Sequence, residues 1–321
     1  HKLKKINKIR YLPDYYFFDD IEILLNEIFY NISLKTKIPV SEKDKLYEEF
    51  KNRILLENKI KLDNSEKKKI GNYSDYFDLV NKISKNSSED IEIFGSKEVW
   101  SIEFIPSISR YFKDSKFIII NRDPRAIIMS MISLGKKDPS QRANIISYAR
   151  QWRKNIEIFS ILTNMKNFKE NLLFLNYEDL LNKTSFIIKK LEDFLDCDLS
   201  NDLDLNISGW RGNSSYKKVS GISKKNFGNW EKFIPRDIED LIIFLCYKEM
   251  LGLQYKIYEN VKNMRLDAIK KAFFKFREEK NFWDSLCDNP ILEYEYELKR
   301  FEFSKNNINK LDNNLFLSKV L

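Results

Sequence analysis

The stretch "KFIIINRDPRAIIMS" (residues 116–130) joins an apolar run to a short polar cluster and then to a second apolar run. Its first part is apolar on both faces of an extended chain, which is typical of a central strand in a parallel sheet. Pro124 favours the first turn of a helix, and Asp123 before it is a favoured helix cap. The stretch therefore predicts a buried strand, a tight turn and a helix.

Arg122 and Ser130 are the two candidate ligand-binding residues of this stretch. Ser130 lies seven residues after Asp123, two turns along the same helix face and about 10 Å along the axis. With the free N–H groups expected at the start of the helix, Arg122 and Ser130 could hold a phosphate-sized anion. Alternatively, Arg122 and Arg125 pair with acids, and Ser130 bonds back to a carbonyl one turn earlier. Spacing alone does not decide between these two interpretations.

Further strands are expected at 91–97 and 171–180, with helices between them, including a long helix at about 143–165. A helix beginning at Pro235 and stopping near Gly252 follows. This alternation predicts an α/β fold with a central parallel sheet flanked by helices, whose ligands bind at the carboxyl ends of the strands. Each predicted strand ends in polar residues, namely Lys97, Arg122-Asp123 and Tyr177-Glu178-Asp179.

The composition limits the function classes without choosing one. The 321 residues carry 56 basic and 48 acidic side chains, a charge of +8 that suits a small anionic ligand, and no nucleic-acid motif accompanies it. Three scattered cysteines without a CxxC pair indicate buried free thiols in a reducing compartment. With no membrane-length apolar run or signal peptide, we expect a cytoplasmic location, unless a leader or anchor preceded His1.

The stretch at 116–130 resembles the 3′-phosphate-binding segment of sulfotransferases that use 3′-phosphoadenosine 5′-phosphosulfate (PAPS). In that family an arginine at the strand end and a serine eight residues later hold the 3′-phosphate, and Arg122 and Ser130 match both. The likeness covers roughly residues 90–256, and such an ordered series is more specific than one motif. It includes "FGSKEVW", "YARQWRKNIEIF", "NLLFLNYEDLL" and a closing loop and helix ending in "LGLQY", where the family has LGY.

The resemblance implies a P-loop NTPase-like three-layer sulfotransferase fold with helical additions at both ends. It implies a catalytic domain at 1–259, followed by a C-terminal helical extension at 260–321. It also implies PAPS as donor, its desulfonated form PAP (3′-phosphoadenosine 5′-phosphate) as product, and an acceptor with a hydroxyl or amine. That acceptor could be a carbohydrate, a peptide tyrosine or a small molecule. The acceptor and the oligomeric state stay open.

Several further residues receive roles from the same resemblance. Lys97 is expected to stabilise charge on the leaving phosphate, and Tyr177 to approach the adenine. Trp152 is expected in the core, Trp230 as the anchor of a closing loop, and Glu178 and Asp179 as caps of the next helix. The loop expected to close over the nucleotide contains Ser214, Ser215, Ser220, Ser223, Lys224 and Lys225.

A carboxylate is the expected general base, because the single histidine, His1, stands at the chain end. In the branches of the family that use a carboxylate, it comes from a region that corresponds here to "YLPDYYFFDD" (11–20). Asp14 is the first candidate, and Asp19 and Asp20 follow. No metal is expected in this mechanism.

Two alternatives remain at this stage. The family's glycine-rich phosphosulfate loop does not occur in these residues and is expected upstream of residue 1. If the native chain lacks that loop, a non-catalytic module that binds nucleotides or polyanions through the 3′-phosphate site is the alternative. A P-loop-type phosphotransferase is a weaker one, because "GSKEVW" lacks the Walker spacing and the Ser or Thr after the lysine.

Overall fold

The computed structural model describes the sheet region and the helices that follow it. The described residues are 93, 102, 105–137, 144–165, 168, 170–199, 228–278 and 289–306. The chain divides into two compact units, one containing Asp19–Ser115 and the other containing Lys116–Leu321. In the first, helix α7 (Ile105–Tyr111) is described. The other described helices and strands all lie in the second unit.

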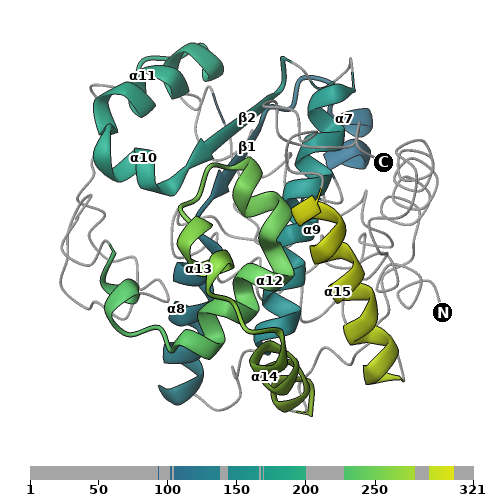
Figure 1. Ribbon diagram of the computed structural model, residues 1–321. Helices are drawn as coiled ribbons and strands as arrows, with labels where there is room; N and C mark the ends of the chain where they lie inside the picture. The colour runs from purple at the N-terminus through teal and green to yellow at the C-terminus, as the bar shows by residue number, and fades with distance from the viewer. Residues whose placement is uncertain are drawn as a thin grey trace, which may run out of the picture. The chain divides into compact units, whose positions relative to one another are not determined.

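The described part of this unit contains a two-stranded parallel sheet (Figure 1). Strand β1 (Phe117–Asn121) pairs with β2 (Leu172–Asn176) along its whole length. Two helices, α8 (Pro124–Lys137) and α9 (Ile145–Asn164), connect the strands. The predicted strand–turn–helix at 116–130 is confirmed, and the protein is a mostly helical α/β structure with a small parallel sheet.

Seven further described elements follow β2 along the chain. Two short helices continue from β2, α10 (Tyr177–Asn182) and α11 (Thr184–Leu195). The remaining described elements are η4 (Asn229–Lys232), α12 (Arg236–Gly252), α13 (Tyr258–Lys262), α14 (Leu266–Glu278) and α15 (Pro290–Asn306). Helix α12 has Pro235 at its cap and ends at Gly252, as the sequence predicts.

The strand predicted at 171–180 is shorter than expected. It ends at Asn176, and the next three residues, Tyr177 to Asp179, form the first turn of α10. Two acidic side chains in that turn favour the positive end of a helix, which explains why the chain leaves the sheet there. The other predicted strand, at 91–97, lies outside the described residues except for Ile93.

The two faces of the sheet are covered by different helices. On one face, Phe174 stacks on Phe159 of α9, with ring centroids 4.3 Å apart, and packs against the main core. On the other face, Leu173 and Leu175 pack against Ile187 of α11 in a small second core. Their register partners on β1, Ile118 and Ile120, are 38% and 60% exposed. The expectation that β1 is buried on both faces is therefore wrong for these two residues.

The main core lies between α9, α12, α14 and α15. Helix α12 runs through its middle, and all ten residues from Leu241 to Met250 are buried. The two C-terminal helices contribute Phe273 and Tyr294, whose rings meet edge to face, 5.4 Å apart. The helices predicted after residue 260 thus share one core with α9 and α12 (Figure 1).

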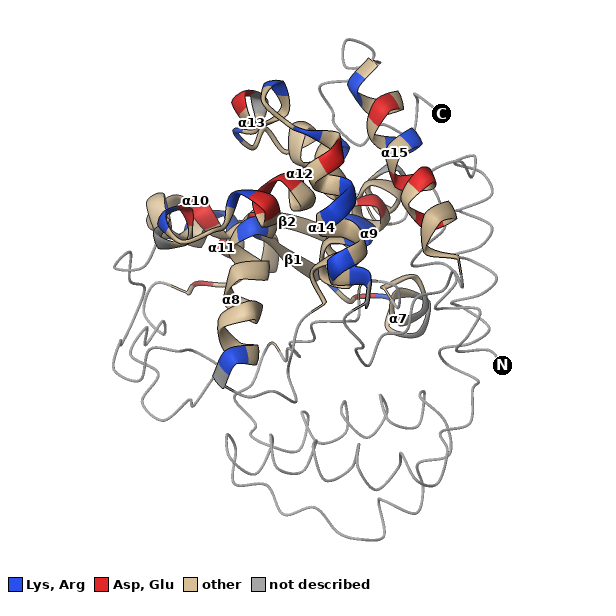
Figure 2. Cartoon of the chain, turned by 60° about the horizontal axis from the view of Figure 1, so that its bottom comes forward, with Lys and Arg blue, Asp and Glu red and all other residues tan. Residues whose placement is uncertain are grey.

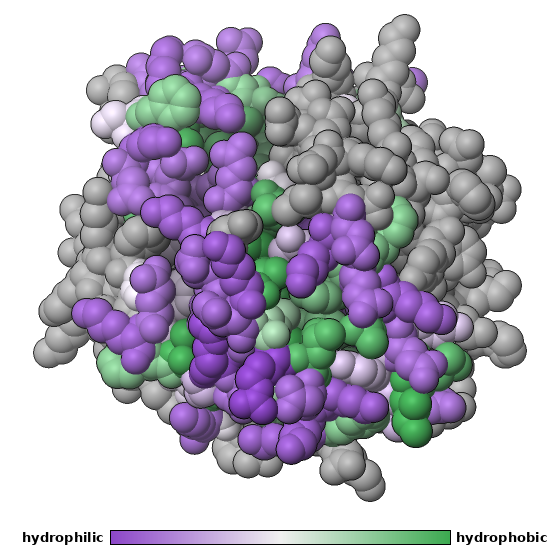
Figure 3. All heavy atoms as spheres, viewed as in Figure 1, coloured by the Kyte–Doolittle hydropathy of each residue, from purple (hydrophilic) through white to green (hydrophobic). Residues whose placement is uncertain are grey.

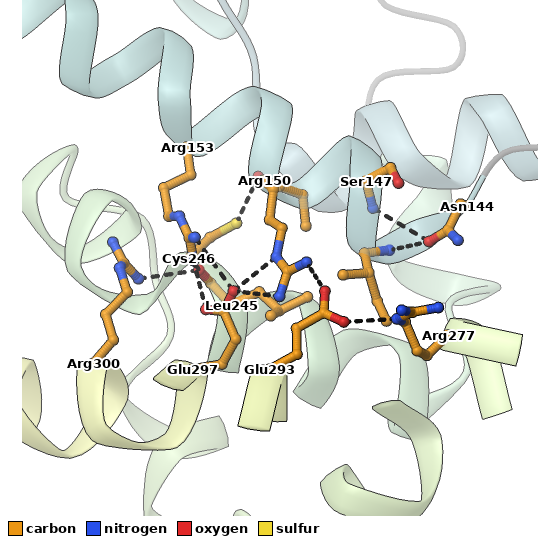
Figure 4. A network of polar contacts seen from close by, with 12 residues as sticks. Asn144, Ser147, Arg150, Arg153, Leu245, Cys246, Arg277, Glu293, Glu297 and Arg300 are labelled. Atoms are coloured by element: carbon orange, nitrogen blue, oxygen red, sulfur yellow. Dashed lines mark hydrogen bonds and ion pairs between the residues drawn. The ribbon is translucent and has the colours of Figure 1, made fainter. Parts of the chain in front are cut away.

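A buried network of charged side chains joins α15 to this core (Figure 4). Glu297 of α15 accepts hydrogen bonds from Arg150 and Arg153 of α9, each at 2.7 Å. Glu293, one turn earlier, pairs with Arg150 and, at 2.6 Å, with Arg277 of α14. Burial alone would raise the pKa of Glu297, but attraction by Arg153 and Arg150 outweighs burial and lowers it to about 2.

The same network contains a kink in α12. Cys246 has non-helical backbone angles (φ −121°, ψ 16°). Beside it, the carbonyl oxygen of Leu245 accepts hydrogen bonds from Arg153 at 2.8 Å and Arg300 at 3.1 Å. The thiol of Cys246 donates to the Ala149 carbonyl at 3.4 Å, so it is a buried free thiol, as predicted. Cys197 is also free, and Cys287 lies outside the described residues.

Replacing Glu297 should destabilise the fold strongly. In Glu297→Gln, Arg150 and Arg153 lose a shared buried counter-charge, which costs about 3–5 kcal/mol in comparable pairs. The matched control is Glu295→Gln on the exposed face of α15, expected to stay within about 0.5 kcal/mol of wild type. Urea unfolding of both variants measures the difference, and equal stabilities would contradict the assignment.

The pH dependence of stability should carry the signature of the same carboxylate. Because the pKa of Glu297 is depressed in the folded protein, its contribution is fully present above the unfolded value, near 4.5, and is lost as pH falls toward 2. Wild-type stability should therefore fall over that range more steeply than the stability of Glu297→Gln. Denaturant titrations between pH 5 and pH 2.5 test this, and parallel curves would count against it.

Candidate functional site

The carboxyl ends of β1 and β2 meet at the same edge of the sheet. Asn121 and Asn176 are register partners there, and the Asn121 amide nitrogen donates to the Asn176 side-chain oxygen at 3.3 Å. Each strand then continues into a polar dipeptide, Arg122-Asp123 or Tyr177-Glu178. This is the edge at which parallel sheets of α/β proteins bind their ligands.

Asn121 is buried and is fixed by side chains from two distant segments, helix α9 and the turn after α12. Its amide nitrogen also donates to the hydroxyl of Tyr255 at 2.9 Å, and its oxygen accepts the indole N–H of Trp152 at 2.9 Å. The same indole N–H lies 3.0 Å from the Arg122 carbonyl oxygen. Burial raises the pKa of Tyr255, so its phenol stays neutral. These bonds hold the end of β1, and with it the backbone of Arg122, in one position.

Trp152 belongs to the main core, as predicted, but its indole N–H gives it a second role at the strand end. Tyr255 is a site residue that the sequence analysis missed. It belongs to "LGLQY", a departure from the family's LGY that gave no reason to expect a contact with β1. Gln254 before it has a positive φ of 60°, which turns the chain after α12 so that Tyr255 reaches Asn121.

Asp123 caps helix α8, as the sequence predicts. Its carboxylate accepts the backbone N–H of Arg125 at 2.8 Å, and its carbonyl accepts that of Ile127 at 3.1 Å. Its own N–H donates to Glu178 at 2.9 Å, and Pro124 has none to offer. The expectation of free N–H groups at this helix start is therefore wrong for Asp123 and Arg125, whose donors already have partners.

The two arginines of the stretch differ sharply. Arg125 is buried, forms ion pairs with Asp123 at 2.7 Å and Glu239 at 3.1 Å, and lies over the ring of Trp230 at 4.8 Å. The guanidinium of Arg122 lies 4.7 Å above the ring of Tyr177 and is partly exposed. Within the described residues, it has neither a hydrogen-bond acceptor nor a carboxylate within ion-pair distance. Internal pairing thus accounts for Arg125 and leaves Arg122 available.

Ser130 lies exposed on α8, two turns from Asp123. Its hydroxyl makes no hydrogen bond to any described residue, unlike Thr184, whose hydroxyl donates to the carbonyl one turn earlier at 2.8 Å. The back-bonded alternative for Ser130 is therefore not observed. Ser130 and Arg122 both keep hydrogen-bonding capacity for a ligand.

Glu178 does not simply cap α10, as the sequence suggested. One of its carboxylate oxygens reaches across the sheet edge to the Asp123 N–H, and the Asn176 side chain makes no cap bond. Burial raises the pKa of Glu178. Asp179 instead forms an exposed ion pair with Lys183 at 3.0 Å. The end of β2 therefore supports the turn that follows β1.

The remaining predicted site residues lie outside the described part of the chain, and their roles stay predictions. They are Asp14, Asp19, Asp20, Lys97, Ser214, Ser215, Ser220, Ser223, Lys224 and Lys225.

The described part of the site offers one available cation, Arg122, and one available hydroxyl, Ser130. Figure 2 shows basic and acidic segments close together near α10 and α12. Arg125 of α8 forms an ion pair with Glu239 of α12. On the face shown in Figure 3, the described residues are mostly hydrophilic, with apolar areas between them.

Among the described residues, no three His, Cys, Asp or Glu side chains gather as metal ligands. No helix in the described ranges is long and apolar enough to cross a membrane.

Removing the Tyr255 hydroxyl should loosen the strand end. In Tyr255→Phe, the amide nitrogen of Asn121 loses the hydroxyl as an acceptor and keeps only the longer hydrogen bond to Asn176. This loss should lower the free energy of unfolding by about 1–2 kcal/mol. Tyr296→Phe, on the exposed face of α15, is the matched control and should have no effect. Thermal unfolding compares the two variants, and a Tyr255→Phe protein as stable as its control would refute the role assigned to the hydroxyl.

Comparison with known proteins gives one family and two relatives. The model of the sulfotransferase family matches residues 36–201, just over half of the chain. A Caenorhabditis briggsae protein named "Putative protein-tyrosine sulfotransferase" is 31% identical over 109 residues, which cover 34% of this chain and 38% of that protein. A Caenorhabditis elegans protein of the same name is 28% identical over 128 residues, which cover 39% of this chain and 48% of that protein.

The matched region spans less than half the length of either relative. No solved structure matches the chain. The family match includes the whole stretch from β1 to α11, and so contains Arg122, Ser130 and Tyr177. The chain belongs to the sulfotransferase family.

Proposed function

We propose that this protein transfers a sulfuryl group from PAPS to an acceptor hydroxyl, and that Arg122 and Ser130 bind the 3′-phosphate of the donor. Family membership supports the reaction class. The names of the two relatives make a peptide tyrosine the first acceptor to test.

One observation carries the assignment of the phosphate site. Of the two arginines that flank Asp123 and Pro124, Arg125 is neutralised internally and Arg122 is not. A guanidinium placed over the ring of Tyr177 still has N–H groups to donate, and those groups match the oxygens of a phosphate. Because the backbone of Arg122 is held through Asn121 and Trp152, a ligand bound there meets a positioned cation.

The proposed reaction is an in-line displacement at sulfur. The acceptor oxygen forms a bond to sulfur while the bond from sulfur to the 5′-phosphate oxygen breaks, and PAP leaves with that electron pair. The acceptor proton passes to a carboxylate, for which Asp14 is the candidate. Lys97 is the candidate that stabilises charge on the leaving phosphate. In this scheme the contribution of the protein is mainly positioning and electrostatic stabilisation.

We also propose that β1 and β2 belong to a larger parallel sheet flanked by helices, in a three-layer fold of the P-loop NTPase type. The exposure of Ile118 and Ile120 supports this, because parallel sheets are normally covered on both faces. A two-stranded parallel sheet is also small for such a fold. The catalytic domain at 1–259, the extension at 260–321 and a cytoplasmic location stay predictions.

Arg122→Ala should weaken PAP binding by about 2–4 kcal/mol, or roughly 30- to 1,000-fold, because it removes a charge-assisted phosphate contact. Adenosine 5′-monophosphate (AMP), which lacks the 3′-phosphate, should bind wild type and variant equally. The matched control is Arg265→Ala, an exposed arginine paired with Asp267. Calorimetric titration of both ligands into all three proteins gives the answer.

Two results would contradict the proposal. An equal loss of affinity for PAP and AMP in Arg122→Ala would show that Arg122 does not read the 3′-phosphate. Normal PAP binding by the wild type with no transfer of labelled sulfate from PAPS to a tyrosine peptide, a sugar or a phenol would favour the non-catalytic binding module instead.

A further inference from the structure

The ends of the two strands contact each other in pairs. Tyr177, the first residue after β2, lies under the guanidinium of Arg122, the first residue after β1. Glu178, the second residue after β2, accepts the N–H of Asp123, the second residue after β1. The two residues that follow β2 therefore support the two residues that follow β1.

The bond to Glu178 holds the N–H of a peptide unit whose carbonyl oxygen, that of Arg122, already accepts a hydrogen bond from Trp152. Pro124 has no N–H, so the Asp123 N–H is the last backbone donor before the helix begins. The strand ladder ends at Asn121, so it does not hold this N–H. The Asp123 side chain is occupied with Arg125. The bond from Asp123 to Glu178 thus fixes the turn on the side away from Trp152.

We propose that Glu178 is a positioning residue for the phosphate site: its carboxylate holds the Asp123 N–H and thereby sets where Arg122 presents its guanidinium. This inference rests on the function proposed above, and assigns to Glu178 a role in donor binding without contact to the donor.

The charge of Glu178 opposes that role, which makes the proposal testable. A carboxylate beside Arg122 weakens the attraction of that site for a phosphate, whereas the hydrogen bond strengthens the site by fixing it. Burial raises the pKa of Glu178, which agrees with a group kept for its geometry and not for its charge. Variants can separate the two effects, because glutamine keeps an acceptor oxygen and loses the charge, and aspartate keeps the charge and withdraws the oxygen.

The test measures PAP binding by calorimetry, together with thermal unfolding, for the wild type, three variants of Glu178 and one control variant. Glu178→Gln should bind PAP within threefold of wild type or more tightly. Glu178→Ala and Glu178→Asp should each bind it at least tenfold more weakly. In PAPS-dependent transfer, these two should raise KM and change kcat less than threefold. Asp179→Ala, at the neighbouring position, is the matched control and should match wild type.

Each outcome separates this inference from the proposed function. A wild type that does not bind PAP defeats the proposed function. A wild type that binds PAP, with Glu178→Asp binding equally well, overturns only the positioning role, as does Glu178→Gln binding as weakly as Glu178→Ala. If Glu178→Ala fails to fold, the comparison of Gln with Asp decides alone. Tighter binding by all neutral variants would assign Glu178 an electrostatic effect only.

Discussion

The hydrogen bonds of Asn121 are the constraint on which the site depends. Asn121 is the last residue of β1. Its side chain accepts a hydrogen bond from Trp152 of α9 and donates hydrogen bonds to Tyr255 after α12 and Asn176 of β2. An amide buried without partners would cost several kcal/mol, so the three elements must approach together for the fold to be stable. The backbone of Arg122, directly after Asn121, is therefore held in place as well. A positioned guanidinium loses less freedom on binding a phosphate than a mobile one.

The contrast between Arg122 and Arg125 shows how one sequence motif divides its charges. Arg125 turns inward, pairs with Asp123 and Glu239 and rests on Trp230, so it links α8 to the start of α12. The guanidinium of Arg122 lies over the ring of Tyr177, which does not accept hydrogen bonds from its N–H groups as a carboxylate would. An aromatic ring is well suited to this purpose, because a carboxylate in its place would neutralise the cation before any ligand arrived.

Much of this architecture could be predicted from the sequence, for identifiable reasons. Continuous apolar runs and the Asp-Pro pair fixed β1, α8 and the cap at Asp123, because such local rules act within a few residues. The end of β2 was placed wrongly, since Tyr177 to Asp179 are compatible with a strand or a helix start until tertiary contacts decide. The roles of Tyr255 and Glu178 depend on contacts 134 and 55 residues apart along the chain, which no local pattern encodes. The network of Glu297 with Arg150 and Arg153 was missed for the same reason.

A crystal structure of the full chain with PAP tests the central claim most directly. We expect the 3′-phosphate within hydrogen-bonding distance of the Arg122 guanidinium and the Ser130 hydroxyl, with Arg122 still over the ring of Tyr177. A nucleotide bound elsewhere, or Arg122 turned toward an internal carboxylate while the phosphate contacts other residues, would contradict it.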